Sequence, residues 1–206
     1  MPINLPNQIT ISRLILAVVS FAVISFYDAH HAQEKRFLLD VCVVLFLVAV
    51  LTDALDGYLA RARNQVTSLG RVLDPFVDKV LICGVFAFFA GPGFVDESGT
   101  NVTGVRTWMV VVILGRELLV TGLRGFSESR GKAFGANWPG KTKMVVQSVT
   151  AVFILVTVAH PGLLFGQTFN DVFRPVLVWT TVVITSLSML SYLWQARDSL
   201  LERSGA

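Results

Sequence analysis

The sequence predicts an all-α membrane protein of six helices, because of its composition and its six long apolar runs. Of its 206 residues, 53% are hydrophobic and only 15% are charged. A soluble domain usually has about 25% charged residues. The mean hydropathy is +0.65. Because a helix satisfies its own backbone hydrogen bonds in lipid, we interpret the apolar runs as membrane-spanning helices.

Each apolar run has about the 20 residues that a helix needs to cross the hydrocarbon core. Glycine and proline gather between the runs, as in GPGFVDESGTNVTG, which indicates loops.

Pro75 is tolerated best in the first turn of a helix, so we expect the third helix to begin at about residues 72–74. The length suits a single domain over residues 1–206. The predicted helices cover roughly residues 8–27, 37–60, 75–95, 106–124, 142–160 and 173–195.

The distribution of positive charge predicts which way the chain crosses the membrane. Six spans place both termini on one side, and that side holds 13 of the 17 Lys and Arg residues. The other side keeps only Lys35, Arg36, Arg106 and Arg174. The positive-inside rule therefore places both termini in the cytoplasm. The formal net charge is only +3, so we expect no nucleic-acid partner.

Four aspartates follow the second apolar run, in DALDGYLARARNQVTSLGRVLDPFVDK. Asp53 and Asp56 are three residues apart and share a helix face, and Asp74 and Asp78, four apart, share another. Both pairs lie at predicted cytoplasmic helix ends, where four unpaired carboxylates would repel one another. Oxygen ligands of this kind suit Mg²⁺ or Mn²⁺, and two ions about 4 Å apart can clamp a phosphoryl displacement.

Two other interpretations of the aspartates remain open from their spacing alone. The acids could form ion pairs with Arg61, Arg63, Arg71 and Lys79. They could also belong to a proton- or ion-translocating channel. Acids within membrane segments are usually functional, which favours a site over a structural ion pair.

The same stretch resembles the signature of the CDP-alcohol phosphotransferases, D-x2-D-G-x2-A-R-x8-G-x3-D-x3-D. In that family a CDP-linked donor gives its substituted phosphoryl group to an alcohol and CMP leaves. Eight fixed positions over 26 residues make a chance match very unlikely. The matching positions are Asp53, Asp56, Gly57, Ala60, Arg61, Gly70, Asp74 and Asp78.

The resemblance implies a role for each acid and two divalent cations, Mg²⁺ or Mn²⁺. Asp53, Asp56 and Asp74 would bind the first ion. Asp53, Asp74 and Asp78 would share the second. Asp78 would also act as the general base on the acceptor hydroxyl.

The resemblance also implies a binding site for the CDP moiety. Gly57, Arg61 and Thr67 would contact it, and an arginine can fork onto a diphosphate. The amino-terminal LPNQITISR resembles the family's opening, a short interfacial segment before the first helix. Asn7 and Thr10 would reach the nucleotide from there. Helix capping by Asn7 is the alternative.

Four cations in the second half suit a phosphorylated acceptor. Arg116 and Arg124, in GRELLVTGLRG, lie on nearly one helix face, and Lys141 and Lys143 open the fifth helix. Anchoring to anionic lipid headgroups is the alternative. Both stretches, together with LDPFVDK and LSMLSYL, resemble the phosphatidylglycerophosphate synthases of bacteria.

That resemblance implies transfer from CDP-diacylglycerol to sn-glycerol 3-phosphate. It also implies a homodimer in the bacterial inner membrane, with its active site at the cytoplasmic interface. A sister enzyme that uses inositol phosphate, serine or phosphatidylglycerol is the nearest alternative. A cation transporter that uses the same acids is an alternative of another class.

Overall fold

The computed structural model describes residues 5–63, 68–129 and 138–201, and these residues form six α-helices with no β-strand among them. The predicted all-α class is confirmed. Two short 3₁₀ turns, η1 (Ala29–His31) and η2 (Pro92–Phe94), lie in the loops. The helices are α1 (Leu5–Ser25), α2 (Ala32–Arg63), α3 (Ser68–Phe89), α4 (Thr107–Ser129), α5 (Trp138–Ala159) and α6 (Gln167–Leu201).

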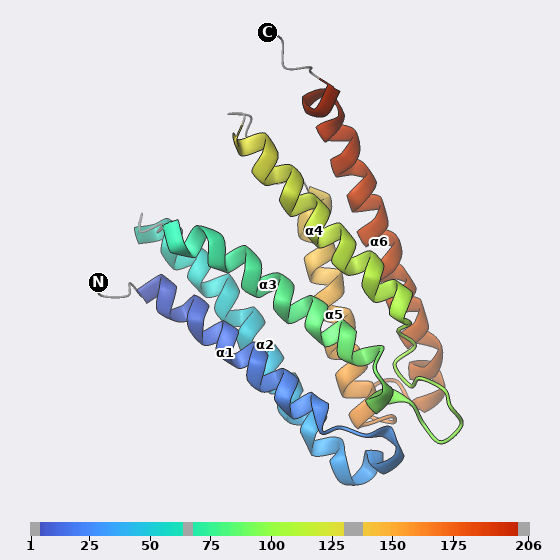
Figure 1. Ribbon diagram of the computed structural model, residues 1–206. Helices are drawn as coiled ribbons and strands as arrows, with labels where there is room; N and C mark the ends of the chain where they lie inside the picture. The colour runs from blue at the N-terminus through green and yellow to red at the C-terminus, as the bar shows by residue number, and fades with distance from the viewer. Residues whose placement is uncertain (1–4, 64–67, 130–137, 202–206) are drawn as a thin grey trace.

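Successive helices run in opposite directions, so the start of α1 and the end of α6 lie at the same end of the bundle (Figure 1). Helices α1, α2 and α3 form one group, and α4 and α6 form another. Helix α5 packs against α2, α3 and α6 and so joins the two groups. At the end that holds the start of α1, the two groups splay apart.

The start of the third helix differs from the prediction. Helix α3 begins at Ser68, several residues before the expected start at 72–74, and Pro75 lies inside it. Pro75 removes one backbone donor, but such a loss is tolerated in membrane helices because neighbouring groups satisfy the freed carbonyls. The prediction was wrong because it treated proline as a helix start. The amino-terminal stretch at 5–13, which the sequence predicts to lead into the first helix, forms the first turns of α1.

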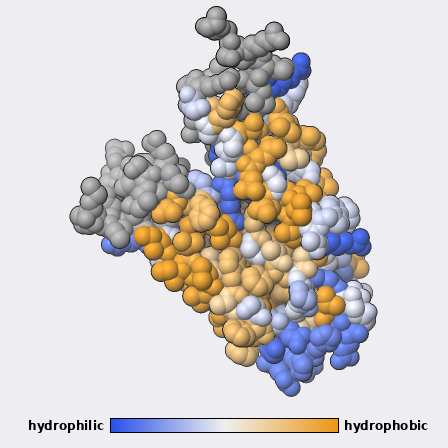
Figure 2. All heavy atoms as spheres, in the orientation of Figure 1, coloured by the Kyte–Doolittle hydropathy of each residue, from blue (hydrophilic) through white to orange (hydrophobic). Residues whose placement is uncertain are grey.

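The surface of the bundle is apolar on every helix. Each helix carries a large hydrophobic side chain that is more than half exposed. Figure 2 shows these surfaces as broad orange areas along both groups of helices. Such a large exposed apolar surface is typical of contact with lipid. One such residue from each helix, in chain order, is Ile15, Val44, Phe76, Val111, Val145 and Leu187.

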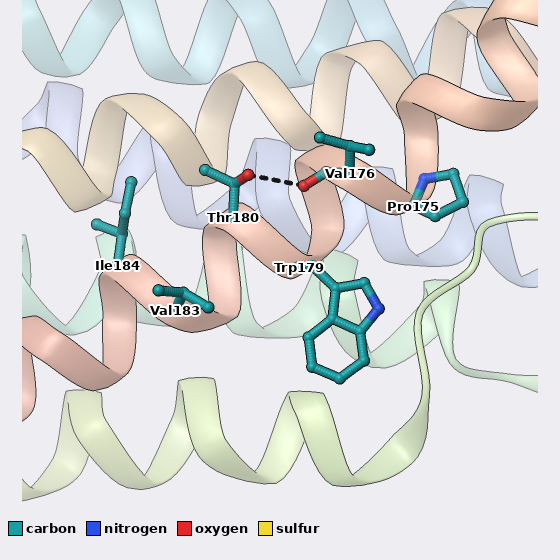
Figure 3. A pocket seen from close by; sticks show the side chains of 6 residues that line it. All are labelled: Pro175, Val176, Trp179, Thr180, Val183 and Ile184. Carbon is teal, nitrogen blue, oxygen red and sulfur yellow. Dashed lines mark hydrogen bonds between the residues drawn. The ribbon is translucent and has the colours of Figure 1, made fainter.

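Three segments of the described chain are long and apolar enough to cross a membrane. They are Gln8–Ser25, Thr142–Ala159 and Gln167–Gln195. A shallow apolar hollow lies on the third of them, lined by α6 residues between Pro175 and Ile184 (Figure 3). Its Thr180 hydroxyl donates to the carbonyl of Val176 at 2.7 Å, so that polar group is satisfied within the helix. This surface therefore suits lipid tails.

The end of the bundle opposite the start of α1 is closed by ordered loops. Asp96 accepts hydrogen bonds from the Ser98 hydroxyl and from the backbone N–H of Thr100, which hold the pKa of Asp96 below its ordinary value. Buried Arg174 of α6 donates to the carbonyl of Val102 (2.6 Å) and to the Thr157 hydroxyl (3.2 Å). Arg174 thus ties α5, α6 and the loop before α4 together, at the end away from the four aspartates.

Candidate active site

Helix packing places Asp78 of α3 beside Arg13 of α1. The Arg13 Nη1 donates to Asp78 Oδ1 at 2.9 Å. The Arg13 side chain is only 2% exposed, whereas that of Asp78 is 29% exposed. Thr10 is also buried, three residues before Arg13 and therefore on the same helix face. The carboxylate is held at the α1–α3 interface and keeps partial access from outside.

The positions of the other predicted ligands follow from the helices that carry them. Asp53 and Asp56 belong to α2, which ends at Arg63, and Asp74 belongs to α3, which begins at Ser68. Only residues 64–67 separate these two helix ends in the sequence. The side chains of some predicted site residues lie outside the described residues, so their roles stay predictions. They are Asn7, Asp53, Asp56, Gly57, Arg61, Thr67, Asp74 and Lys141.

A second polar cluster joins α4 and α5. Arg116 and Glu117 of α4 and Lys143 of α5 are all buried. The Arg116 Nη1 donates to Glu117 Oε1 at 3.1 Å, and the Lys143 ammonium contacts the same carboxylate oxygen. A buried charge needs a partner, and Glu117 supplies one to both cations. Two of the four predicted acceptor-binding cations are therefore brought together.

Two residues of α6 also contact the arginines of α4. The Arg116 Nη2 donates to the Ser188 hydroxyl at 2.8 Å, and the Arg124 Nη2 donates to the Tyr192 hydroxyl at 2.9 Å. The carbon centres of the two guanidinium groups lie 5.4 and 5.6 Å from the centre of the Tyr192 ring. The Nε atoms of Arg116 and Arg124 are buried and have no hydrogen-bond partner among the described residues. These arginines keep donors that an anion can fill.

The two clusters lie near one another. Helix α3 packs against both α4 and α5. The charge of Lys143 interacts electrostatically with those of Asp78 and Lys79, and the charge of Lys79 interacts with that of Arg116. Figure 2 shows hydrophilic atoms at the base of the hollow between the two groups of helices. A carboxylate and a group of cations thus face one region of the bundle, as a site that binds both a metal ion and a phosphate requires.

Comparison with known proteins decides the family. A family model described as CDP-alcohol phosphatidyltransferase matches residues 3–187. The chain belongs to this family. Relatives named CDP-diacylglycerol–glycerol-3-phosphate 3-phosphatidyltransferase match over nearly their whole lengths. The Bacillus subtilis (strain 168) relative is 32% identical over 94% of this chain and 96% of its own. That of Haemophilus influenzae is 29% identical over 98% of both chains.

CDP-alcohol phosphatidyltransferases generally depend on a divalent cation. The described residues around Asp78 fit one. Its carboxylate is a hard oxygen donor of the kind that Mg²⁺ and Mn²⁺ prefer. The ammonium group of neighbouring Lys79 donates to the carbonyl of Pro75 at 2.8 Å. Among the side chains that the structure describes, which do not include those of the other three aspartates, there is no group of three or more metal-binding residues.

Two parts of the site were missed from the sequence. The pair between Arg13 and Asp78 joins residues 65 positions apart, which no local spacing reveals. Ser188 and Tyr192 lie in LSMLSYL, a stretch that carries the resemblance but was given no role in the site, although their spacing of four does place them on one helix face. The signal for Arg13 that the sequence did offer is a charged residue within an apolar run.

Proposed function

We propose that the protein transfers the phosphatidyl group from CDP-diacylglycerol to sn-glycerol 3-phosphate, giving phosphatidylglycerophosphate and CMP. The observation that carries this proposal is the end-to-end match to relatives named for that reaction. A third relative, from Salmonella choleraesuis (strain SC-B67), is 30% identical over 98% of this chain and 100% of its own. The protein is accordingly a transferase of phospholipid biosynthesis.

The proposed chemistry centres on Asp78. Its carboxylate takes the proton from the primary hydroxyl of glycerol 3-phosphate, and that oxygen attacks the β-phosphorus, which carries the diacylglycerol. The bond from this phosphorus to the oxygen of the CMP phosphate breaks, and CMP leaves. Two divalent cations, held by Asp53, Asp56, Asp74 and Asp78, would neutralise charge on the diphosphate. The contact with Arg13 supports this role because it fixes the direction of the Asp78 carboxylate.

The donor and the acceptor would bind on different sides of Asp78. Residues of α2, the α2–α3 connection and α1 would hold the CDP moiety, and an arginine there suits a diphosphate. We assign this role to Asn7, Thr10, Gly57, Arg61 and Thr67. The acceptor phosphate would bind to the cations of α4 and α5, whose partnerless Nε donors support the assignment. These cations are Arg116, Arg124, Lys141 and Lys143.

We further propose that all six helices cross the inner membrane of a bacterium as one domain spanning residues 1–206. An exposed apolar face on each helix supports this. The splayed end of the bundle, with the aspartates, would face the cytoplasm, and CDP-diacylglycerol would enter from the bilayer. A homodimer is the assembly that the family resemblance suggests.

The decisive assay is CMP release from CDP-diacylglycerol by the purified protein, with and without glycerol 3-phosphate. Release that requires glycerol 3-phosphate supports the proposal. If inositol phosphate, serine or phosphatidylglycerol replaces it as the better acceptor, the protein is a sister enzyme. Ion movement across vesicles in the absence of CDP-diacylglycerol, with no release of CMP, would instead identify a transporter.

Membrane orientation can be tested by labelling introduced cysteines, because both native cysteines, Cys42 and Cys83, are buried. Glu97, in the loop before α4, and Arg197, near the end of α6, are exposed. We expect an impermeant maleimide to label Glu97→Cys in intact cells and to label Arg197→Cys only after the membrane is opened. The reverse pattern would place the aspartates on the outer face and contradict the assignment.

Loss of the guanidinium beside Asp78 should slow turnover. We expect Arg13→Gln to lower kcat about tenfold, since a charged hydrogen bond contributes roughly 1.5–3 kcal/mol and here it orients the proposed base. Arg13→Lys should recover part of the loss. Arg174→Gln is the matched control, because Arg174 is also buried but lies at the other end of the bundle. It should lower the melting temperature without lowering kcat of the folded protein. Equal kcat values for Arg13→Gln and the wild type would contradict the prediction.

A further inference from the structure

Two polar side chains of α6, Ser188 and Tyr192, each accept a hydrogen bond from one of two arginines of α4, Arg116 and Arg124. Arg116 and Arg124 are eight residues apart on α4, and Ser188 and Tyr192 are four apart on α6. Arg116 Nη2 bonds to Ser188 Oγ (2.8 Å), and Arg124 Nη2 bonds to the Tyr192 hydroxyl (2.9 Å). Ser188 and Tyr192 are each only 1% exposed, so water cannot readily replace these contacts.

Tyr192 also contacts both guanidinium groups through its ring. Arg116 lies 5.4 Å and Arg124 lies 5.6 Å from the ring centre, within the range of a cation–π interaction. A single side chain thus stabilises two like charges that would otherwise repel one another. Glu117 is bonded to Arg116 and Lys143, and the described contacts of Arg124 are with Tyr192. The position of Arg124 therefore depends on Tyr192.

One N–H donor of each arginine, at Nε, takes no part in these contacts with Ser188 and Tyr192. Arg116 Nε and Arg124 Nε are buried without a hydrogen-bond partner among the described residues. A buried N–H without a partner is costly, and such groups in native structures usually serve a bound ligand or water. Ser188 and Tyr192 fix the terminal nitrogens of the guanidinium groups, which restricts where the remaining N–H groups can point.

We propose that Ser188 and Tyr192 are positioning residues that orient Arg116 and Arg124 for the phosphate of the acceptor. This inference rests on the proposed function, because it assigns these arginines to glycerol 3-phosphate. Tyr192 does not touch the substrate. It acts through Arg124 by its hydroxyl and through both arginines by its ring, and Ser188 acts through Arg116.

Tyr192→Phe tests the hydroxyl while keeping the ring. We expect the KM for glycerol 3-phosphate to rise about tenfold, as loss of a charged hydrogen bond allows. The KM for CDP-diacylglycerol and the kcat should stay within twofold of wild type. Tyr27→Phe is the matched control, since Tyr27 is a buried tyrosine that packs against Phe94 outside this cluster. It should leave both KM values unchanged.

A double-mutant cycle separates positioning from general packing. If Tyr192 acts through Arg124, Tyr192→Phe should raise the acceptor KM in the wild type but add less than twofold in an Arg124→Ala background. An equal rise in both backgrounds would overturn the proposal for Tyr192. If Tyr192→Phe does not fold, Ser188→Ala gives the same test against Arg116→Ala. Unchanged acceptor KM in a folded variant would also overturn it.

The wild-type assay distinguishes failure of this inference from failure of the proposed function. If wild-type protein releases no CMP with glycerol 3-phosphate, the proposed function fails and this inference fails with it. If the wild type is active and the Tyr192→Phe and Ser188→Ala variants both match it in acceptor KM, only the positioning role is wrong. A parallel rise in both substrate KM values would indicate a general structural effect and would likewise overturn the positioning role.

Discussion

Excess EDTA is expected to reduce CMP release to background, and added Mg²⁺ or Mn²⁺ is expected to restore it. The physical reason is the gathering of Asp53, Asp56, Asp74 and Asp78 on two connected helices, where four carboxylates would repel one another. Arg13 supplies one positive charge, to Asp78 at 2.9 Å. Lys79 donates to a backbone carbonyl. Arg116 and Lys143 are bonded to Glu117.

The control for this experiment is EDTA saturated with Mg²⁺ beforehand, which should leave turnover unchanged. A second measurement does not depend on activity. A cation that binds the folded protein should raise its melting temperature as the ion concentration increases. Asp53→Asn and Asp74→Asn should weaken that increase. Full turnover in excess EDTA would refute the metal site, whatever the melting temperatures show.

The helices were predictable from the sequence because hydropathy reports directly on burial in lipid. Every predicted run lies mainly within one observed helix, but α2 continues to Arg63 and α6 to Leu201, beyond the apolar runs. A helix needs no apolar environment to continue, since its backbone is already hydrogen-bonded. The sequence did not predict the start of α3 at Ser68, because Pro75 was interpreted as marking the first turn of the helix. In a membrane bundle, neighbouring groups can satisfy the carbonyl that a proline frees, so Pro75 can lie inside the helix.

The candidate site was predictable only where one local pattern carries the information. The spacing of Asp74 and Asp78 gives their shared face without any tertiary structure. The partners of Asp78 and Arg124 do not follow from spacing. Arg13 reaches Asp78 across the α1–α3 interface, and Tyr192 reaches Arg124 across the α4–α6 interface. Such contacts depend on how helices pack and rotate, which a single sequence does not specify.

The contacts among Arg116, Glu117 and Lys143 also depend on tertiary structure that the sequence alone does not specify. The sequence placed Arg116 and Lys143 near a phosphate site, but it did not reveal that both bind Glu117. Adjacent residues such as Arg116 and Glu117 do not face each other on an ideal helix surface. Arg116 and Glu117 nevertheless form an ion pair, because the two buried cations need a counter-ion and the nearest carboxylate supplies it.

Asp78→Asn is expected to lower kcat at least about 10²-fold while CDP-diacylglycerol still binds. The amide keeps the shape of the side chain and an oxygen that can accept the hydrogen bond from Arg13, but it cannot take a proton from the acceptor hydroxyl. A hydroxyl is a poor nucleophile until its proton is removed. The variant should therefore fold and bind the donor but turn over slowly. Donor binding and steady-state kinetics on the purified variant measure the two effects separately.

Two matched variants show whether the loss is specific to the proposed base. Asp171→Asn makes the same change in another carboxylate near an arginine, since Asp171 lies 3.7 Å from Arg174 at the other end of the bundle. It should leave kcat unchanged. Asp53→Asn should instead weaken the binding of both the metal ion and the donor, because we assign Asp53 to metal binding alone. If Asp78→Asn turns over at the wild-type rate, Asp78 is not the base, and the proton of the acceptor must go to another group.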